Sequence, residues 1–140
     1  MSESVNFHFD IDGENFTSAG EASVRIKKLL REMGFSPDVI RRVSVAMYEG
    51  EINMVIHANG GSADIDVFGD RIQIVLADQG PGIPNIDLAM QEGYSTAPDN
   101  IRSLGFGAGM GLPNMKRYTD EMKVESEVGK GTTVTMVVNV

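Results

Sequence analysis

The sequence predicts an α+β domain, in which amphipathic helices pack on a sheet. Several runs alternate apolar and polar residues, as half-buried strands do. Two longer stretches in the first 60 residues repeat apolar residues at helical spacing. Short turns that contain glycine join two pairs of these strands, which is typical of hairpins.

Length and composition bound the class of protein. A chain of 140 residues, 41% hydrophobic and 23% charged, fits one globular domain over residues 1–140. The net charge of −8 argues against nucleic acid as a partner, and the absence of cysteine excludes disulfides and cysteine-bound zinc. The start of the chain is polar and acidic, and no apolar run has membrane-spanning length. A cytoplasmic protein with no membrane partner is expected.

The first predicted elements are a strand and a helix. Val5–Ile11 alternates strictly, with its apolar residues on one face. Thr17 or Ser18 is expected to cap a helix that runs to about Met33, and Gly34 to end it. This helix carries a basic cluster that fits either a solvated face or a docking site for a partner: Arg25, Lys27, Lys28 and Arg31.

A second helix is predicted to begin with Ser36 as its N-cap and Pro37 in its first turn. It is expected to run to about His57, where Asn59-Gly60-Gly61 ends it. At about 100° per residue, its apolar residues form one broad arc that should face a core: Val39, Ile40, Val43, Ala46, Met47, Gly50 and Met54.

Two polar residues of this helix, Glu49 and Asn53, fall inside the apolar arc, one turn apart. Burial of a carboxylate is costly unless it has partners or a function, so this pair is a candidate site. The alternative is that the two side chains satisfy each other as a surface pair. Glu51 projects to the opposite, polar face with Ser44 and Tyr48, and its replacement is expected to change little.

The next two strands, Ala63–Phe68 and Arg71–Ala77, are predicted to form a hairpin around Gly69-Asp70. Asp78 follows the second strand and opens the turn Gly80-Pro81-Gly82. A carboxylate in this place can accept a hydrogen bond at the floor of a pocket, for example from the amine of adenine. An ordinary turn with a surface aspartate is the alternative.

The most distinctive stretch is Gly105-Phe106-Gly107-Ala108-Gly109-Met110-Gly111-Leu112, in which four glycines alternate with other residues. The backbone N–H groups of such a run, followed by a helix, can form a phosphate cradle. A flexible linker is the alternative. The polar segment Ile83–Leu104, with one short helix at Leu88–Glu92, is expected to belong to a mobile lid over about residues 83–108.

The chain is expected to close with a helix and two strands. The helix runs from about Met110 to Thr119, and a strand follows at Met122–Glu127. The turn Gly129-Lys130-Gly131 then leads to the last strand, Thr132–Val138.

Four motifs in this order resemble the N, G1 and G2 boxes of the GHKL ATPase superfamily, which holds gyrase B, MutL, heat-shock chaperone ATPases and histidine kinases. They are Glu49-x-x-x-Asn53, Asp78-x-Gly80-x-Gly82, Gly105-x-Gly107-x-Gly109-x-Gly111 and Gly131-Thr132. The resemblance spans nearly the whole chain. It implies the Bergerat fold, a two-layer α/β sandwich with a mixed, mostly antiparallel sheet, helices on one face, and ATP between helices and lid.

Within the superfamily, the chain resembles the anti-sigma factor and switch-kinase branch of bacterial serine/threonine protein kinases, and especially the RsbT-type switch kinase. The segments Tyr48–Ala58, Met90–Thr96 and Gly105–Asn114 carry this resemblance. Histidine kinases usually have asparagine in place of Glu49, which argues against that class. Gly50 departs from the branch, which often has alanine, and should cost the helix up to about 1 kcal/mol.

The resemblance implies a role for each motif residue. Glu49 is the base that accepts the proton of a serine or threonine hydroxyl, and Asn53 is a ligand of Mg²⁺. Asp78 binds the adenine amine, with Thr132 in support. The other nucleotide-binding positions are Gly80, Gly82, Gly105, Gly107, Gly109, Met110, Gly111 and Leu112.

Two functions follow as expectations. The first is a kinase that uses ATP and Mg²⁺ to phosphorylate a serine or threonine of a STAS-domain antagonist protein in a bacterial stress or sigma-factor pathway. The second is a binding module that sequesters a sigma factor or a PP2C-type phosphatase, with ATP as a structural ligand. The complete set of motifs favours the first.

Overall fold

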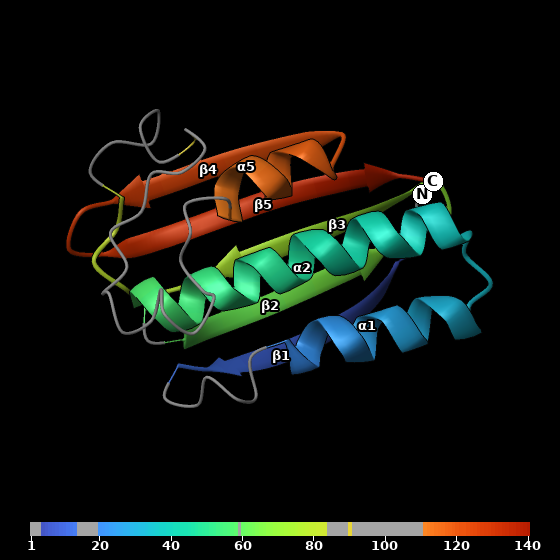
Figure 1. The fold of residues 1–140 in the computed structure, drawn as a ribbon, viewed down its shortest axis with the longest axis horizontal. Coiled ribbons are helices and arrows are strands. Elements are labelled where there is room, and N and C mark those ends of the chain that lie inside the picture. The colour runs from blue at the N-terminus through green and yellow to red at the C-terminus, as the bar shows by residue number, and fades with distance from the viewer. Residues whose placement is uncertain (1–3, 14–19, 59, 84–89, 91–110) are drawn as a thin grey trace.

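The computed structural model describes residues 4–13, 20–58, 60–83, 90 and 111–140. These residues form two layers, a sheet and a layer of helices on one of its faces (Figure 1). The elements in chain order are β1 Val5–Asp12, α1 Glu21–Glu32, α2 Pro37–Ala58, β2 Gly60–Val67, β3 Arg71–Ala77, α5 Gly111–Arg117, β4 Glu121–Glu127 and β5 Gly131–Asn139.

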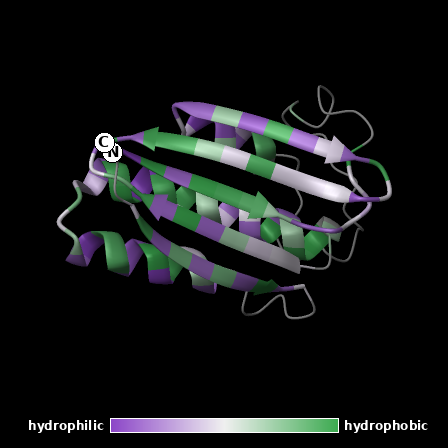
Figure 2. Cartoon of the chain, turned by 180° about the vertical axis from the view of Figure 1, so that it is seen from behind, coloured by the Kyte–Doolittle hydropathy of each residue, from purple (hydrophilic) through white to green (hydrophobic). Residues whose placement is uncertain are grey.

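The sheet has the strand order β1-β2-β3-β5-β4, and each of these described neighbours pairs antiparallel. The α+β class and the helices on one face agree with the prediction, whereas the parallel pairing of a mixed sheet is not seen among the described strands. Figure 2 shows the sheet from its other side, where the strands carry mixed polar and apolar residues. In the predicted hairpin, the Phe68 N–H donates to the Arg71 carbonyl at 2.9 Å.

The core lies between the helices and the sheet. Strands β2, β3 and β5 alternate buried and partly exposed residues, as a sheet with one covered face does. Residues of the apolar arc of α2 close the core from the other side, and the seven predicted members of that arc are buried. No helix among the described residues has the length and apolarity needed to cross a membrane.

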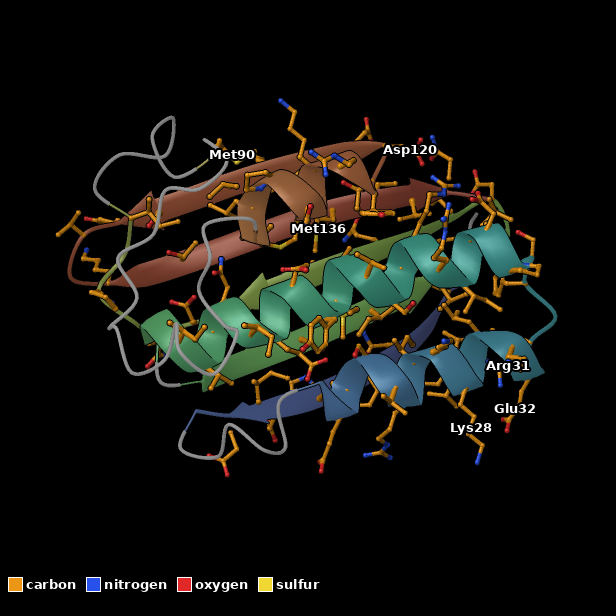
Figure 3. All side chains as sticks on the ribbon, viewed as in Figure 1. Lys28, Arg31, Glu32, Met90, Asp120 and Met136 are labelled. Atoms are coloured by element: carbon orange, nitrogen blue, oxygen red, sulfur yellow. The ribbon has the colours of Figure 1, made fainter. Side chains whose placement is uncertain are left out.

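The two long helices begin in different ways. The Ser36 hydroxyl accepts the Val39 N–H at 3.3 Å, so the predicted N-cap of α2 is confirmed. Helix α1 begins later than predicted, at Glu21, after Gly20 with φ of 100°. The predicted caps Thr17 and Ser18 lie outside the described residues. In Figure 3 the basic and acidic side chains Lys28, Arg31 and Glu32 point outward from α1.

Gly50 has a packing reason that the sequence did not reveal. A Cβ added there would lie 2.0 Å from Cδ1 of Leu76 and 3.6 Å from Sδ of Met115. Glycine therefore lets α2 approach β3 closely. The expected cost in helix propensity accompanies a close contact with the sheet, which alanine could make only if Leu76 moved.

Candidate nucleotide-binding and catalytic site

The described motif residues gather at one end of the molecule. Glu49 and Asn53 lie on the second half of α2, Asp78 follows β3, and Thr132 lies at the start of β5. Helix α5 packs beside α2 and brings Asn114 to this region. Segments far apart in the sequence thus meet here.

Glu49 is partly buried and reaches toward α5. Its Oε1 accepts a hydrogen bond from Nδ2 of Asn114 at 3.3 Å. Burial raises the pKa of the Glu49 carboxyl, and the amide of Asn114 offsets part of that rise. A carboxylate with a raised pKa is a better proton acceptor than an exposed one.

Asn53 is also partly buried, one helical turn beyond Glu49. The described partner of Glu49 is Asn114 rather than Asn53, so the alternative of a self-satisfied surface pair is not what the structure shows. No side-chain hydrogen bond joins Asn53 to another described residue. The Asn53 amide is therefore available to bind a ligand. The described part of the chain contains no group of three or more acidic, histidine or cysteine residues that could hold a metal ion.

Asp78 is fixed by the backbone around it. Its Oδ1 accepts the N–H of Gly80 at 3.0 Å and the N–H of Thr132 at 3.1 Å. The Asp78 N–H in turn donates to the Thr132 carbonyl at 2.9 Å. The hydrogen bonds found among the described residues leave Oδ2 free, so the aspartate can offer a held acceptor to a ligand.

A serine that the sequence analysis missed completes this network. The hydroxyls of Ser126 and Thr132 lie 2.9 Å apart, and Ser126 Oγ accepts the Ile83 N–H at 2.7 Å. Ser126 also donates to the Gly131 carbonyl at 3.2 Å. The only signal in the sequence is a serine at an inward position of β4, opposite Thr132, which is visible only once the strand register is known.

The glycines of the first turn are required by close packing. A Cβ on Gly80 would lie 2.6 Å from Cβ of Ala58, at the end of α2. Gly82 has φ of 80°, and a Cβ there would lie 2.5 Å from the Glu127 carbonyl oxygen. Gly131 has φ of 132°, and a Cβ there would lie 2.2 Å from the Asp78 carbonyl oxygen. At these three glycines, neighbouring segments lie so close that there is no room for a side chain.

The second glycine motif is only partly described. Gly111 is the first residue of α5, and Leu112 is 5% exposed in the core. Four predicted binding residues lie outside the described residues: Gly105, Gly107, Gly109 and Met110. The expected lid over residues 83–108 also lies outside them, except at Ile83 and Met90. The phosphate cradle and the lid therefore stay predictions.

Glu51 contradicts the sequence analysis. The sequence predicts that Glu51 lies on the polar face of α2, but only 2% of its surface is exposed. Its carboxylate accepts backbone N–H groups of Gly20, Ala22 and Ser23 at the start of α1. The helical projection failed because α1 covers this flank of α2, which a single-helix projection does not include.

Comparison with known proteins identifies the family of the chain. Residues 15–138 match the family described as histidine kinase-like ATPase domain. The chain belongs to this family, and it is an ATPase- or kinase-class domain of the GHKL type, as the motifs predicted. ATP use follows for this class.

The individual relatives indicate which branch of the family the chain resembles. The chain is 34% identical to the serine/threonine-protein kinase RsbT of Bacillus subtilis over 77% of this chain and 78% of the relative. It is 38% identical to an anti-sigma F factor of Clostridium acetobutylicum, over 82% and 80% respectively. These relatives support the predicted serine/threonine kinase and its branch.

A solved structure supports the fold. The RsbU and RsbW domains of a Mycobacterium tuberculosis protein superpose with a TM-score of 0.64 at 17% identity. The alignment covers 96% of this chain and 32% of that one. The predicted α+β fold class is thereby confirmed.

Proposed function

We propose that this protein is a serine/threonine kinase that transfers the γ-phosphate of ATP to a hydroxyl of a STAS-domain antagonist protein, and so switches the partners of a stress or sigma-factor pathway. The observation that carries the proposal is Glu49, a partly buried carboxylate with a raised pKa beside the nucleotide motifs. A histidine acceptor would have less need of such a base, whereas a hydroxyl must lose its proton as it attacks.

The residues present fit the nucleotide and the metal. Asp78 holds one carboxylate oxygen against two backbone N–H groups and leaves the other to bind the adenine amine. The amide oxygen of Asn53 has no hydrogen bond to another described residue, so it can bind Mg²⁺. This cation takes few protein ligands beside phosphates and waters. The metal would neutralise charge on the phosphates.

Two residues of this chain, Glu49 and Asn114, act in the proposed phosphoryl transfer. The substrate hydroxyl oxygen bonds to the γ-phosphorus while the bond from that phosphorus to the β–γ bridging oxygen breaks, and ADP leaves with the electron pair. Glu49 takes the hydroxyl proton. Asn114, which donates to Glu49 Oε1 at 3.3 Å, holds the carboxylate in orientation.

A second function has its own support. Several relatives are named anti-sigma F factors, which points to a protein that also binds a sigma factor. In this case the protein sequesters its partner, with ATP as a structural ligand. A PP2C-type phosphatase is the other protein that it would sequester in this way. We expect binding and phosphorylation to use the same nucleotide-bound form.

Labelled ATP separates the two functions. The purified protein, Mg²⁺ and a purified STAS-domain protein are incubated together, and the label is located by mass spectrometry. A kinase gives phosphoserine or phosphothreonine on the STAS protein and none on histidine. Absence of transfer, together with persistent nucleotide-dependent partner binding, would contradict the kinase proposal and support sequestration.

A further inference from the structure

Glu51 caps a helix to which it does not belong. Its Oε2 accepts the N–H groups of Gly20 at 2.9 Å and Ala22 at 3.3 Å, and its Oε1 accepts that of Ser23 at 2.6 Å. The first N–H groups of a helix have no partner within the helix, and Gly20 has no side chain to supply one. Both oxygens of a buried carboxylate are therefore used to hold α1 against α2.

This cap lies in the same turn as the proposed base. Glu51 is two residues after Glu49 and two before Asn53, and it faces α1, whereas Glu49 reaches Asn114 of α5. Figure 1 shows α1 and α5 on opposite sides of α2. This turn of α2 is thus held from both flanks within three residues.

A second contact also holds the start of α1 against α2. A Cβ added at Gly20 would lie 3.0 Å from the ring of Tyr48, the residue before Glu49. The chain at Gly20 thus lies directly against α2, and α2 cannot rotate about its axis without breaking the bonds to Glu51. Such a rotation would carry Glu49 with it.

We propose that Glu51 is a positioning residue: by capping α1 from α2, it fixes the turn that bears Glu49 and so sets the rate of phosphoryl transfer. The inference rests on the proposed kinase function. A displacement of about 1 Å can cost a reaction roughly a hundredfold in rate. Adenine binding should be spared, because Asp78 is held by the N–H groups of Gly80 and Thr132 and its position does not depend on the bonds to Glu51.

Two replacements of Glu51 test the inference. Glu51→Gln offers one acceptor oxygen where three donors converge, and Glu51→Asp keeps the charge but shortens the reach. Both are measured at a temperature far below their melting points. We expect kcat to fall about ten- to a hundredfold, with the dissociation constant for ADP changed less than about twofold. Amide exchange at Gly20, Ala22 and Ser23 should accelerate.

A matched control separates positioning from loss of stability. Ile26→Val removes one methylene from the buried face of α1 and leaves the cap untouched. It should lower the melting temperature and keep the parental kcat. Parental kcat in both folded Glu51 variants, or failure of both to fold, overturns the positioning role. A parent that transfers no phosphate overturns the kinase function and this inference together.

Discussion

At the scale of the residue, Glu49 shows how surroundings set the chemistry of a carboxylate. Glu49→Gln keeps the shape and the acceptor oxygen for Asn114 but cannot take a proton. Transfer should fall by roughly 10²–10⁴-fold, while calorimetry should show parental nucleotide affinity. The exposed Glu32→Gln is the control and should leave transfer unchanged. Parental transfer in the Glu49 variant would show that another group is the base.

The raised pKa of Glu49 predicts the pH dependence of transfer. Activity needs the ionised carboxylate, so it is present above the pKa of Glu49 and lost as the pH falls through it. Because burial raises that pKa, the loss should begin at a higher pH than the ordinary value of 4.5 would give. Single-turnover rates between pH 4.5 and 8 check this, and an acid limb that persists unchanged in Glu49→Gln would contradict the assignment.

Asp78 allows a sharper test, because its two oxygens have different tasks. In Asp78→Asn the amide oxygen can keep the bonds to Gly80 and Thr132, which turns the NH₂ toward the adenine amine. Two donors then face each other, so nucleotide affinity should fall roughly 10- to 100-fold, as loss of a charge-assisted hydrogen bond would give. Calorimetry measures the affinity, and an unchanged melting temperature shows that the turn survived. Parental affinity would place adenine elsewhere.

At the scale of the element, two glycines with nearly equal backbone angles form a matched pair. Gly82 and Gly129 have φ of 80° and 83°, but a Cβ on Gly129 meets nothing within 4 Å. Both alanine variants carry the strain of a positive φ, about 1–2 kcal/mol. Gly82→Ala also forces a Cβ against Glu127 and should cost about 1–3 kcal/mol more in free energy of unfolding.

Urea denaturation of the two glycine variants measures this difference. Gly82→Ala should also weaken nucleotide binding, because its turn follows Asp78, whereas Gly129→Ala should not. Equal losses of stability in the two variants would mean that the turn relaxes away from β4 without penalty.

At the scale of the whole molecule, an ion pair joins the start of α2 to the far end of the sheet. Arg42 donates to Asp120 at 2.8 Å and to the Asn139 carbonyl at 3.0 Å, and Asp120 accepts the Asn139 N–H at 2.7 Å. Asp120 is labelled in Figure 3, between α5 and β4. The Asn139 N–H and then Arg42 lower the pKa of Asp120.

A group with a lowered pKa stabilises the fold above its ordinary pKa and loses that contribution as the pH falls through the lowered value. Asp120→Asn should therefore be less stable than the parent near pH 7, and the difference should shrink toward pH 3. Urea denaturation at both pH values checks the sign. The exposed Asp70→Asn is the control, and a difference that grows in acid would contradict the linkage.

Residue order alone predicted the class of protein, the order of the helices and strands that the structure describes, and which residues are candidates for the site. The strand and helix patterns, the turns and the four motifs depend on local spacing, which residue order records directly. Alternation placed the covered face of the sheet, and the helical projection placed Glu49 and Asn53 away from the exposed face of α2, where both are partly buried. Family membership followed from the motifs, since their spacing is a property of the chain.

The tertiary structure decided what depends on neighbours from elsewhere in the chain. Glu51 looked exposed on an isolated helix and is buried, because α1 brings three N–H donors to its flank. Gly50 looked like a weakness of α2 and is a close contact with Leu76. Ser126 gained its place only through the register of β4 with β5. These contacts of Glu51, Gly50 and Ser126 join segments that are distant in the sequence, so no local pattern contains them.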